Sequence, residues 1–125
     1  NLSNLQLLRL MAAGIYSLTG SRVIERGADY SFTMDVNTST GEYPLSGKLI
    51  SGYIYRAWDR SLEKNWDTEV LSQASGIVQF SLSGSQTAQL SLAPLFHEIF
   101  IFDTNNNTST KVLEGNIMIV GGGLP

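Results

Sequence analysis

The stretch Tyr30-Ser-Phe-Thr-Met-Asp-Val36 alternates apolar and polar residues along its whole length. Apolar side chains recur at every second position, which is the period of a β-strand with one buried face. The turn formers Asn37-Thr-Ser-Thr-Gly41 follow directly and would end such a strand. The stretch therefore predicts a half-buried strand that is closed by a turn.

Five further segments carry strand signals at intervals typical of an antiparallel β-sandwich. They are residues 48–58, 66–71, 76–82, 98–103 and 112–120, with turn-forming residues between them. Residues 83–90 lack alternation and begin with serines that can cap a helix, so a short helical turn is predicted there. The predicted fold class is all-β, and the expected core includes Phe32, Ile54, Phe80, Ile101 and Ile117.

The first 24 residues lack this alternation. Apolar residues recur there at helical spacing, and the resulting stripe consists of Leu5, Leu8, Met11 and Ile15. An isolated helix of about a dozen residues is marginal in water, so the stripe must be buried against another surface. We expect residues 1–24 to form an apolar, helical assembly arm, residues 25–120 the sandwich, and residues 121–125 a flexible tail.

The groove for this arm is expected on a neighbouring subunit, with helix-in-groove docking as the mode. The expected protein-interface residues are Leu5, Leu8, Arg9, Met11 and Ile15. In the alternative, the arm folds back over the edge of its own sheet and protects that edge from strand pairing. Deletion of residues 1–20 should leave a folded, soluble monomer only if the arm is intermolecular.

Composition excludes several classes of protein. The chain has 125 residues, a net charge of −3, a single histidine and no cysteine. The lack of cysteine rules out disulfides, zinc–thiolate sites, iron–sulfur clusters and a thiol nucleophile. The negative charge argues against a nucleic-acid partner, because such affinity comes from neutralising phosphates. The apolar run at residues 5–16 is too short to span a bilayer, so no membrane partner is expected.

No set of residues indicates catalysis. His97 follows a turn at the start of a strand, and we interpret it as a surface or strand-edge residue rather than a general base. The aspartates are scattered and lack the spacing of an EF-hand loop. We therefore expect no enzymatic activity, no metal site and no cofactor.

Aromatic residues offer a second type of site, because exposed rings can stack on sugars. Tyr53 and Tyr55 share one face of their predicted strand, and Trp66 lies beside a loop. These three residues are candidates for ligand stacking, although for Trp66 a place in the core is the preferred interpretation. Trp58 is expected in the core, on a central strand.

Four short motifs occur in a fixed order along the predicted sandwich. They are Glu25-Arg-Gly-Ala-Asp-Tyr-Ser-Phe-Thr33, Tyr43-Pro-Leu-Ser-Gly-Lys-Leu-Ile50, Gly76-Ile-Val-Gln-Phe-Ser-Leu-Ser83 and Leu113-Glu-Gly-Asn-Ile-Met-Ile-Val120. Together they resemble the immunoglobulin-like domain at the N-terminus of tailed-phage baseplate upper proteins and related small phage virion proteins. The sequence departs from that pattern at Ala28, which separates the glycine from the acidic residue, and in its apolar arm.

The resemblance implies an immunoglobulin-like β-sandwich located in a virion, with a structural role in the tail or baseplate. Its implied partners are other virion proteins and copies of itself. Within a virion, a capsid cement or connector protein is the alternative, because such proteins also carry arms. Outside this class, the alternative is a carbohydrate-binding or adhesin-type module, since sandwich folds host both functions.

Overall fold

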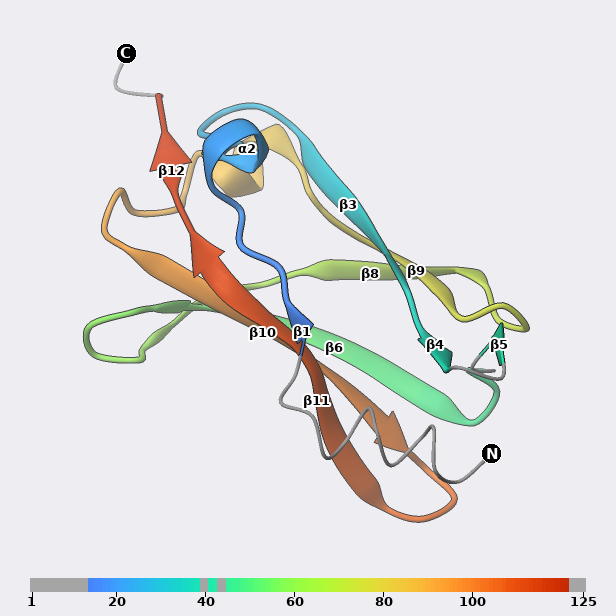
Figure 1. The fold of residues 1–125 in the computed structure, drawn as a ribbon. Helices are drawn as coiled ribbons and strands as arrows, with labels where there is room; N and C mark the ends of the chain where they lie inside the picture. The colour runs from blue at the N-terminus through green and yellow to red at the C-terminus, as the bar shows by residue number, and fades with distance from the viewer. Residues whose placement is uncertain (1–13, 39–40, 43–44, 122–125) are drawn as a thin grey trace.

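The computed structural model describes residues 14–38, 41–42 and 45–121 of the chain. Its regular structure is almost entirely β-strand (Figure 1), which confirms the predicted all-β class. In chain order the elements are β1 (Gly14–Ile15), the 3-10 helix η1 (Gly20–Arg22), β2 (Ile24–Glu25), β3 (Tyr30–Asp35), β4 (Asn37–Thr38), β5 (Gly41–Glu42), β6 (Lys48–Arg56), β7 (Leu62–Asn65), β8 (Asp67–Ser72), β9 (Ile77–Leu82), α2 (Gly84–Thr87), β10 (Leu95–Asp103), β11 (Thr108–Ile117) and β12 (Ile119–Val120).

The larger sheet has five strands in the order β1-β11-β10-β6-β7. β10 lies at its centre, as expected for a strand whose sequence is apolar on both faces. β11 and β6 pair antiparallel with the two sides of β10, and β7 pairs antiparallel with β6. β1 is added to the free side of β11 in parallel. The turn-forming residues between the predicted segments 98–103 and 112–120 therefore connect β10 to β11 as a hairpin.

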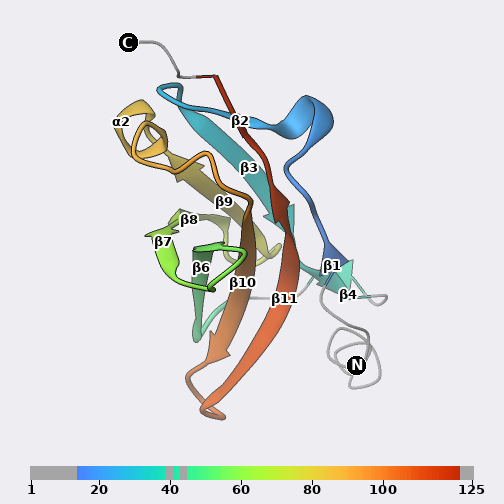
Figure 2. The ribbon, with the colours of Figure 1, turned by 90° about the vertical axis from the view of Figure 1, so that its left-hand side faces the viewer.

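The smaller sheet consists of β3, β9 and β8, all antiparallel. Two short pairs accompany the sheets, β12 with β2 in parallel and β4 with β5 antiparallel. The β10–β11 hairpin projects beyond the smaller sheet at one end of the molecule, whereas α2 lies at the other end (Figures 1 and 2). The alternation that predicted β3 places its apolar side chains toward the larger sheet.

One core joins the two sheets. The ring of Phe32 on β3 lies 5.1 Å from that of Phe80 on the same sheet and 5.1 Å from that of Trp66, measured between ring centroids. It also lies 5.7 Å from the imidazole of His97, which belongs to the larger sheet. All five predicted core residues are buried, with at most 8% of their surface exposed: Phe32, Ile54, Phe80, Ile101 and Ile117.

The chain passes from the smaller to the larger sheet through α2, within the predicted helical turn. Ser83 caps this helix, because its hydroxyl accepts a hydrogen bond from the backbone N–H of Gln86. The side chain of Gln86 in turn accepts from the backbone N–H of Ser83, which completes a capping box. Thr87 is buried, and its hydroxyl accepts a hydrogen bond from the N–H of Gly27. The turn thus also holds the segment that precedes β3.

The two tryptophans occupy opposite environments, and only Trp66 lies in the core, the interpretation preferred for it from the sequence. Trp66 joins β7 of the larger sheet to β8 of the smaller one and is only 4% exposed. Its ring packs over Gly52, where an added Cβ would lie 2.8 Å from a Trp66 ring carbon. Trp58, which we expected in the core, is 72% exposed in the loop between β6 and β7. The expectation for Trp58 is wrong because the strand ends at Arg56.

Residues 14–24 belong to the folded domain, which corrects the arm boundary expected at residue 24. β1 pairs with β11 and β2 with β12, and both Leu18 and Ile24 are fully buried. Ile15, expected in a helical stripe, lies in β1 instead. Local periodicity missed this because the partner strands are about 100 residues away in sequence. The other predicted arm residues lie outside the described part of the chain: Leu5, Leu8, Arg9 and Met11.

Candidate functional site

The outward side of the larger sheet carries a cluster of aromatic side chains. Tyr53 and Tyr55 project from β6, and Phe96 and Phe100 project from β10, on the side opposite the buried residues of both strands. We call these four residues the aromatic face. Because Phe96 lies directly opposite Tyr55 in the strand register, their rings stack with centroids 5.2 Å apart. Tyr53 lies 6.2 Å from Tyr55 and 5.9 Å from Phe100, so the rings form a continuous group.

A buried carboxylate lies in the middle of this face. Glu98 is 7% exposed, and one of its carboxylate oxygens lies 3.1 Å from the ammonium of Lys111 on β11. The same oxygen lies 3.6 Å from the guanidinium of Arg60. Hydrogen bonds to Glu114 and Glu98 raise the pKa of Lys111, which keeps the ammonium charged. The charge of Glu98 is therefore compensated within the chain.

Arg60 also covers two of the rings. Its guanidinium carbon lies 4.6 Å from the ring centroid of Phe96 and 5.8 Å from that of Tyr55. Such cation–π contacts are worth about 0.5–1 kcal/mol at exposed sites. Burial beside these groups, together with the charge of Glu98, raises the pKa of Tyr55, so its phenol stays neutral at physiological pH.

Apolar side chains extend this surface toward the margins of the sheet. Ile15 on β1 lies opposite Glu114 of β11, which in turn lies opposite Glu98, so Ile15 belongs to the outward side. It is 71% exposed. Leu62 on β7 lies opposite Tyr55, and Leu49 precedes the ring pair on β6. Both leucines are more than half exposed. The surface thus has rings at its centre, apolar side chains at its margins, and a Glu98 carboxylate that is paired within the chain.

The structure brings together two of the three predicted stacking residues. Tyr53 and Tyr55 are half-buried neighbours on one face, as the spacing predicted. Trp66 is not available to a ligand, because its ring is buried between the sheets. This corrects the stacking assignment for Trp66 and favours the core interpretation that was weighed beside it.

His97 is a core residue, so the expectation of a surface or strand-edge histidine is wrong. Its side chain is fully buried, and the indole N–H of Trp66 donates to its Nδ1 at 3.3 Å. Nε2 lies 2.9 Å from the carbonyl oxygen of Tyr16, which can only accept, so Nε2 carries the proton. Burial lowers the pKa of His97, and the neutral ring serves as a link between Trp66 and the segment before η1.

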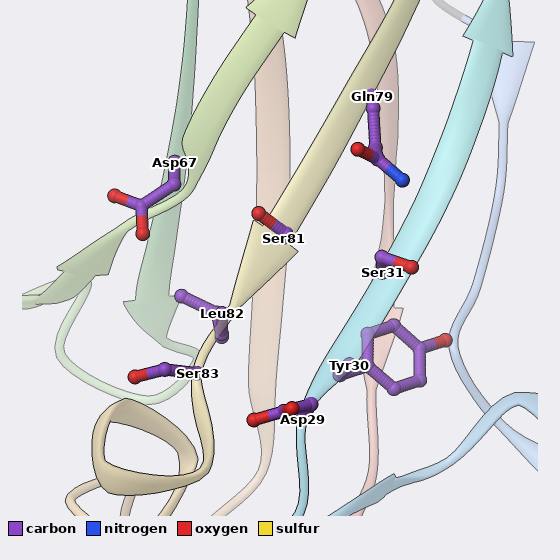
Figure 3. Close-up of a pocket in the computed structure, with 8 residues that line it drawn as sticks. All are labelled: Asp29, Tyr30, Ser31, Asp67, Gln79, Ser81, Leu82 and Ser83. Atoms are coloured by element: carbon purple, nitrogen blue, oxygen red, sulfur yellow. The ribbon is translucent and has the colours of Figure 1, made fainter.

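A polar pocket of about 420 Å³ lies on the outward side of the smaller sheet. Ser31, Ser81 and Asp67 form one row across β3, β9 and β8, because they are directly opposite in register. Gln79 and Tyr30 also line the pocket (Figure 3). The hydroxyl of Tyr30 already donates to the carbonyl oxygen of Arg22. The pocket could hydrogen-bond a polar ligand, but it lies on the opposite side of the molecule from the aromatic face.

No cluster of three or more His, Asp or Glu side chains among the described residues could hold a metal ion. Within the same residues, no helix has the length and apolar character needed to cross a membrane.

Sequence reasoning missed half of the aromatic face. It predicted a strand at residues 98–103 but did not assign a role to Phe96, Phe100 or the buried Glu98 between them. The signal was present, because a strand with apolar side chains at both even and odd positions must place some of them outward. Neither protein-family models nor curated proteins give a match for this chain.

Proposed function

We propose that this chain is a structural protein of a tailed-phage particle, a component of the tail or baseplate that acts by packing against neighbouring proteins. The observation that carries the proposal is the aromatic face, an apolar surface on the outward side of the larger sheet. A surface of this kind gains free energy when another protein removes it from water.

The charges on the aromatic face suit a protein partner. Burying an unpaired carboxylate in an interface would cost several kcal/mol. Glu98 is already paired with Lys111 and Arg60 in the isolated chain, so a partner need not supply a charge. Tyrosine and arginine are also the residues that most often dominate interface energies. Tyr53, Tyr55 and Arg60 therefore form the centre of the proposed contact.

The arm supplies the second contact in this proposal. Leu5, Leu8, Arg9 and Met11 precede the described residues, and Ile15 is the member of the stripe whose position is known. Ile15 is 71% exposed on the outward side of the larger sheet. It is thus free to contact a neighbour, as the assembly role requires.

The resemblance of the four motifs to phage immunoglobulin-like domains supports the virion as the location. Two β-sheets that share one core, joined by a capped helical turn, are compatible with an immunoglobulin-like sandwich. A capsid cement or connector protein is the alternative position within the particle. The partners we propose are other virion proteins and copies of this chain, without nucleic acid or membrane.

Mass spectrometry of purified phage particles tests this proposal. We expect peptides of this chain in particles that have passed through a density gradient, at a constant ratio to the other virion proteins. Absence of the chain from particles, with its peptides present in the infected-cell lysate, would overturn the proposal.

A carbohydrate-binding module remains the second candidate, and the polar pocket is the observation that favours it. Hydroxyl, amide and carboxylate groups line this pocket, from Ser31, Ser81, Gln79 and Asp67. Binding to an oligosaccharide array that is lost in Asp67→Asn and retained in Tyr53→Ser would favour this function over packing. If the unsubstituted chain binds no glycan on the array, this candidate is removed.

A further inference from the structure

We propose that protonation of His97 releases residues 14–17 from the edge of β11 while the two sheets stay folded, which makes this histidine a pH-dependent latch. The inference goes beyond the proposed function and does not depend on it. It rests on a break in the pairing of the N-terminal segment with β11, where a side chain occupies the place of a backbone donor.

The regular form of this pairing is present at Leu18. Its backbone N–H donates to the carbonyl oxygen of Asn116, and its carbonyl oxygen accepts from the N–H of Met118. This is the evenly spaced pattern of a parallel ladder. Tyr16 lies two residues earlier in the same register. In a regular ladder its carbonyl oxygen would therefore accept from the N–H of Asn116.

At Tyr16 this pattern is broken. Its N–H donates to a carbonyl oxygen of β11 at 2.8 Å, as expected, but the N–H of Asn116 donates to the hydroxyl of Ser17. The carbonyl oxygen of Tyr16 lies over Gly115 and accepts from Nε2 of His97 at 2.9 Å. His97 is directly opposite Gly115 in the register of β10 with β11. One buried imidazole thus supplies the donor that the backbone ladder lacks at this point.

The neutral ring of His97 fits this site, and the charged ring does not. Nδ1 accepts from the indole N–H of Trp66 at 3.3 Å, so a proton on Nδ1 would face another donor. The rings of Phe32 and Trp66 pack against the imidazole, and none of the surface of His97 is exposed. The hydrogen bond to Tyr16 favours the charged ring, but burial outweighs it and lowers the pKa of His97.

The charges around His97 do not stabilise a protonated ring. In the described part of the chain, no ion pair includes its imidazole. Glu98 follows it on β10 and lies opposite Glu114, so both carboxylates project to the outward side of the sheet. The N-terminal segment instead brings a positive charge, since the guanidinium of Arg22 lies 4.9 Å from the centroid of the Tyr16 ring. The side chains that β6, β3 and the β7–β8 junction place nearest to the imidazole are uncharged: Ile54, Tyr30, Phe32 and Trp66.

Release of residues 14–17 is the smallest movement that lets water reach this ring. The segment covers the Nε2 side of the imidazole through the carbonyl of Tyr16. Its first two residues are exposed and its last two are half-buried, so little apolar surface is lost apart from the contact of Tyr16 with Phe32. Leu18, by contrast, is fully buried and bonded to β11 on both sides. It therefore anchors the chain and serves as the hinge.

Release would also change the margin of the aromatic face. Ile15 lies on the same outward side as Glu98 and is paired with β11 through β1. When β1 leaves, Ile15 leaves this surface, and the backbone groups of β11 that it covered become a free strand edge. The protonation state of a core histidine thus controls a part of the exposed surface.

Amide hydrogen exchange of the full chain, followed by NMR between pH 7.5 and pH 5, tests the proposal. The protection of an amide is its exchange rate relative to an unstructured chain at the same pH, and it measures how often its hydrogen bond opens. Tyr16 and Leu18 form a matched pair, because both N–H groups donate to β11. Only Tyr16 belongs to the released segment, and Leu18 reports the opening of the anchored part.

We expect the protection of the Tyr16 amide to fall at least about fivefold from pH 7.5 to pH 5. The open form takes up a proton near the ordinary pKa of 6.5, whereas the closed form does so only at a lower pH. At pH 5 the Tyr16 amide should exchange at least about ten times faster than the Leu18 amide, since the anchored part opens more rarely. Equal protection of the two amides at pH 5 would overturn the proposal, because the segment would then open only when the domain unfolds. So would a protection of Tyr16 that does not change with pH.

The His97→Gln variant is the control for the titrating group. Its amide keeps a donor for the carbonyl of Tyr16 and an acceptor for the N–H of Trp66, but it takes up no proton in this range. The Tyr16 amide of this variant should have the same protection at pH 7.5 and pH 5. A decrease equal to that of the parent chain would show that another group drives the release and would overturn the proposal. The comparison of Tyr16 with Leu18 in the parent chain does not require that this variant folds.

Discussion

His97 couples the core to the N-terminal segment through a ring that must stay neutral. Its imidazole accepts from Trp66 and donates to the carbonyl of Tyr16, and it is fully buried. Protonation would place a charge in the core and would replace the acceptor at Nδ1 with a donor that faces the Trp66 N–H. At this position the histidine is therefore a structural group that senses pH.

The pKa of His97 gives a signed prediction. Burial lowers this pKa below its ordinary value of 6.5, so the unfolded chain takes up a proton first as the pH falls. The contribution of His97 to stability is present above pH 6.5 and is lost progressively below it. We expect the free energy of unfolding, measured in urea, to decrease between pH 7.5 and pH 5.

The His97→Gln variant provides the control for this measurement. It should be less stable than the parent chain at pH 7.5 but nearly independent of pH between 7.5 and 5. The surface carboxylates Asp59 and Asp103 have lowered pKa values and titrate in a more acidic range, outside this window. An identical pH dependence in both chains would contradict the role given to His97.

Gly115 permits the N-terminal segment to lie against β11. A Cβ at this position would lie 2.2 Å from the carbonyl oxygen of Tyr16, so the backbone would have to move. We expect Gly115→Ala to lower the free energy of unfolding by roughly 3 kcal/mol, the upper range for overpacking. Gly14→Ala is the matched control, since its Cβ would meet only an ordinary contact at 3.6 Å. Comparable losses for the two variants, measured by denaturant unfolding, would refute the argument.

At the scale of the element, β6 shows how one strand serves two surfaces. Ile54 is fully buried on its inward side, whereas Leu49 is 60% exposed on its outward side. Truncation of Ile54 to alanine should cost about 2–5 kcal/mol, because it leaves a cavity in the core. Leu49→Ala should change stability by less than about 0.5 kcal/mol. Thermal and urea unfolding of both variants would check this difference, and equal effects would contradict the assigned orientation of the strand.

The N-terminal elements change the expected outcome of a deletion. We expected removal of residues 1–20 to leave a folded monomer, but this deletion also removes β1 and the buried Leu18. It should therefore unfold or aggregate the domain. Deletion of residues 1–13 keeps every described contact and should leave a folded chain that no longer assembles. Circular dichroism and sedimentation of the two truncated chains distinguish these outcomes, and a folded 21–125 fragment would contradict this account.

Sequence patterns predicted the elements better than their partners. Alternation identified β3 and β9 and their buried residues, because burial of one face imposes a period of two on any strand. It could not place residues 14–24, whose strands pair with β11 and β12 at the far end of the chain. It also could not tell which side of β6 is covered, since both sides carry aromatic or aliphatic residues. Trp58 was expected in the core because the local pattern did not show that β6 ends at Arg56.

The candidate site was predictable only in part. The spacing of Tyr53 and Tyr55 placed them together, and this was confirmed. Phe96 and Phe100 join them only through the register of β6 with β10, a contact between residues more than 40 positions apart. The compensation of Glu98 by Lys111 and Arg60 likewise depends on three separate elements. Pairing over such separations is set by the whole fold and leaves no local pattern.

At the scale of the whole molecule, the two outward sides differ in chemistry. The larger sheet presents the aromatic face with its internally paired charges, and the smaller sheet presents a polar pocket lined by serine, aspartate and glutamine. In the function that we propose, the larger sheet faces a protein neighbour and the smaller sheet faces water.

Hydroxyl-radical footprinting of purified particles and of the free protein tests this assignment most directly. The account predicts that oxidation of the aromatic face is several-fold slower in the particle, at Tyr53, Tyr55, Phe96 and Phe100. Leu71 on β8, which is half exposed, should react at a similar rate in both samples and serves as the internal reference. Equal oxidation rates for the aromatic face in the particle and in the free protein would contradict the central claim.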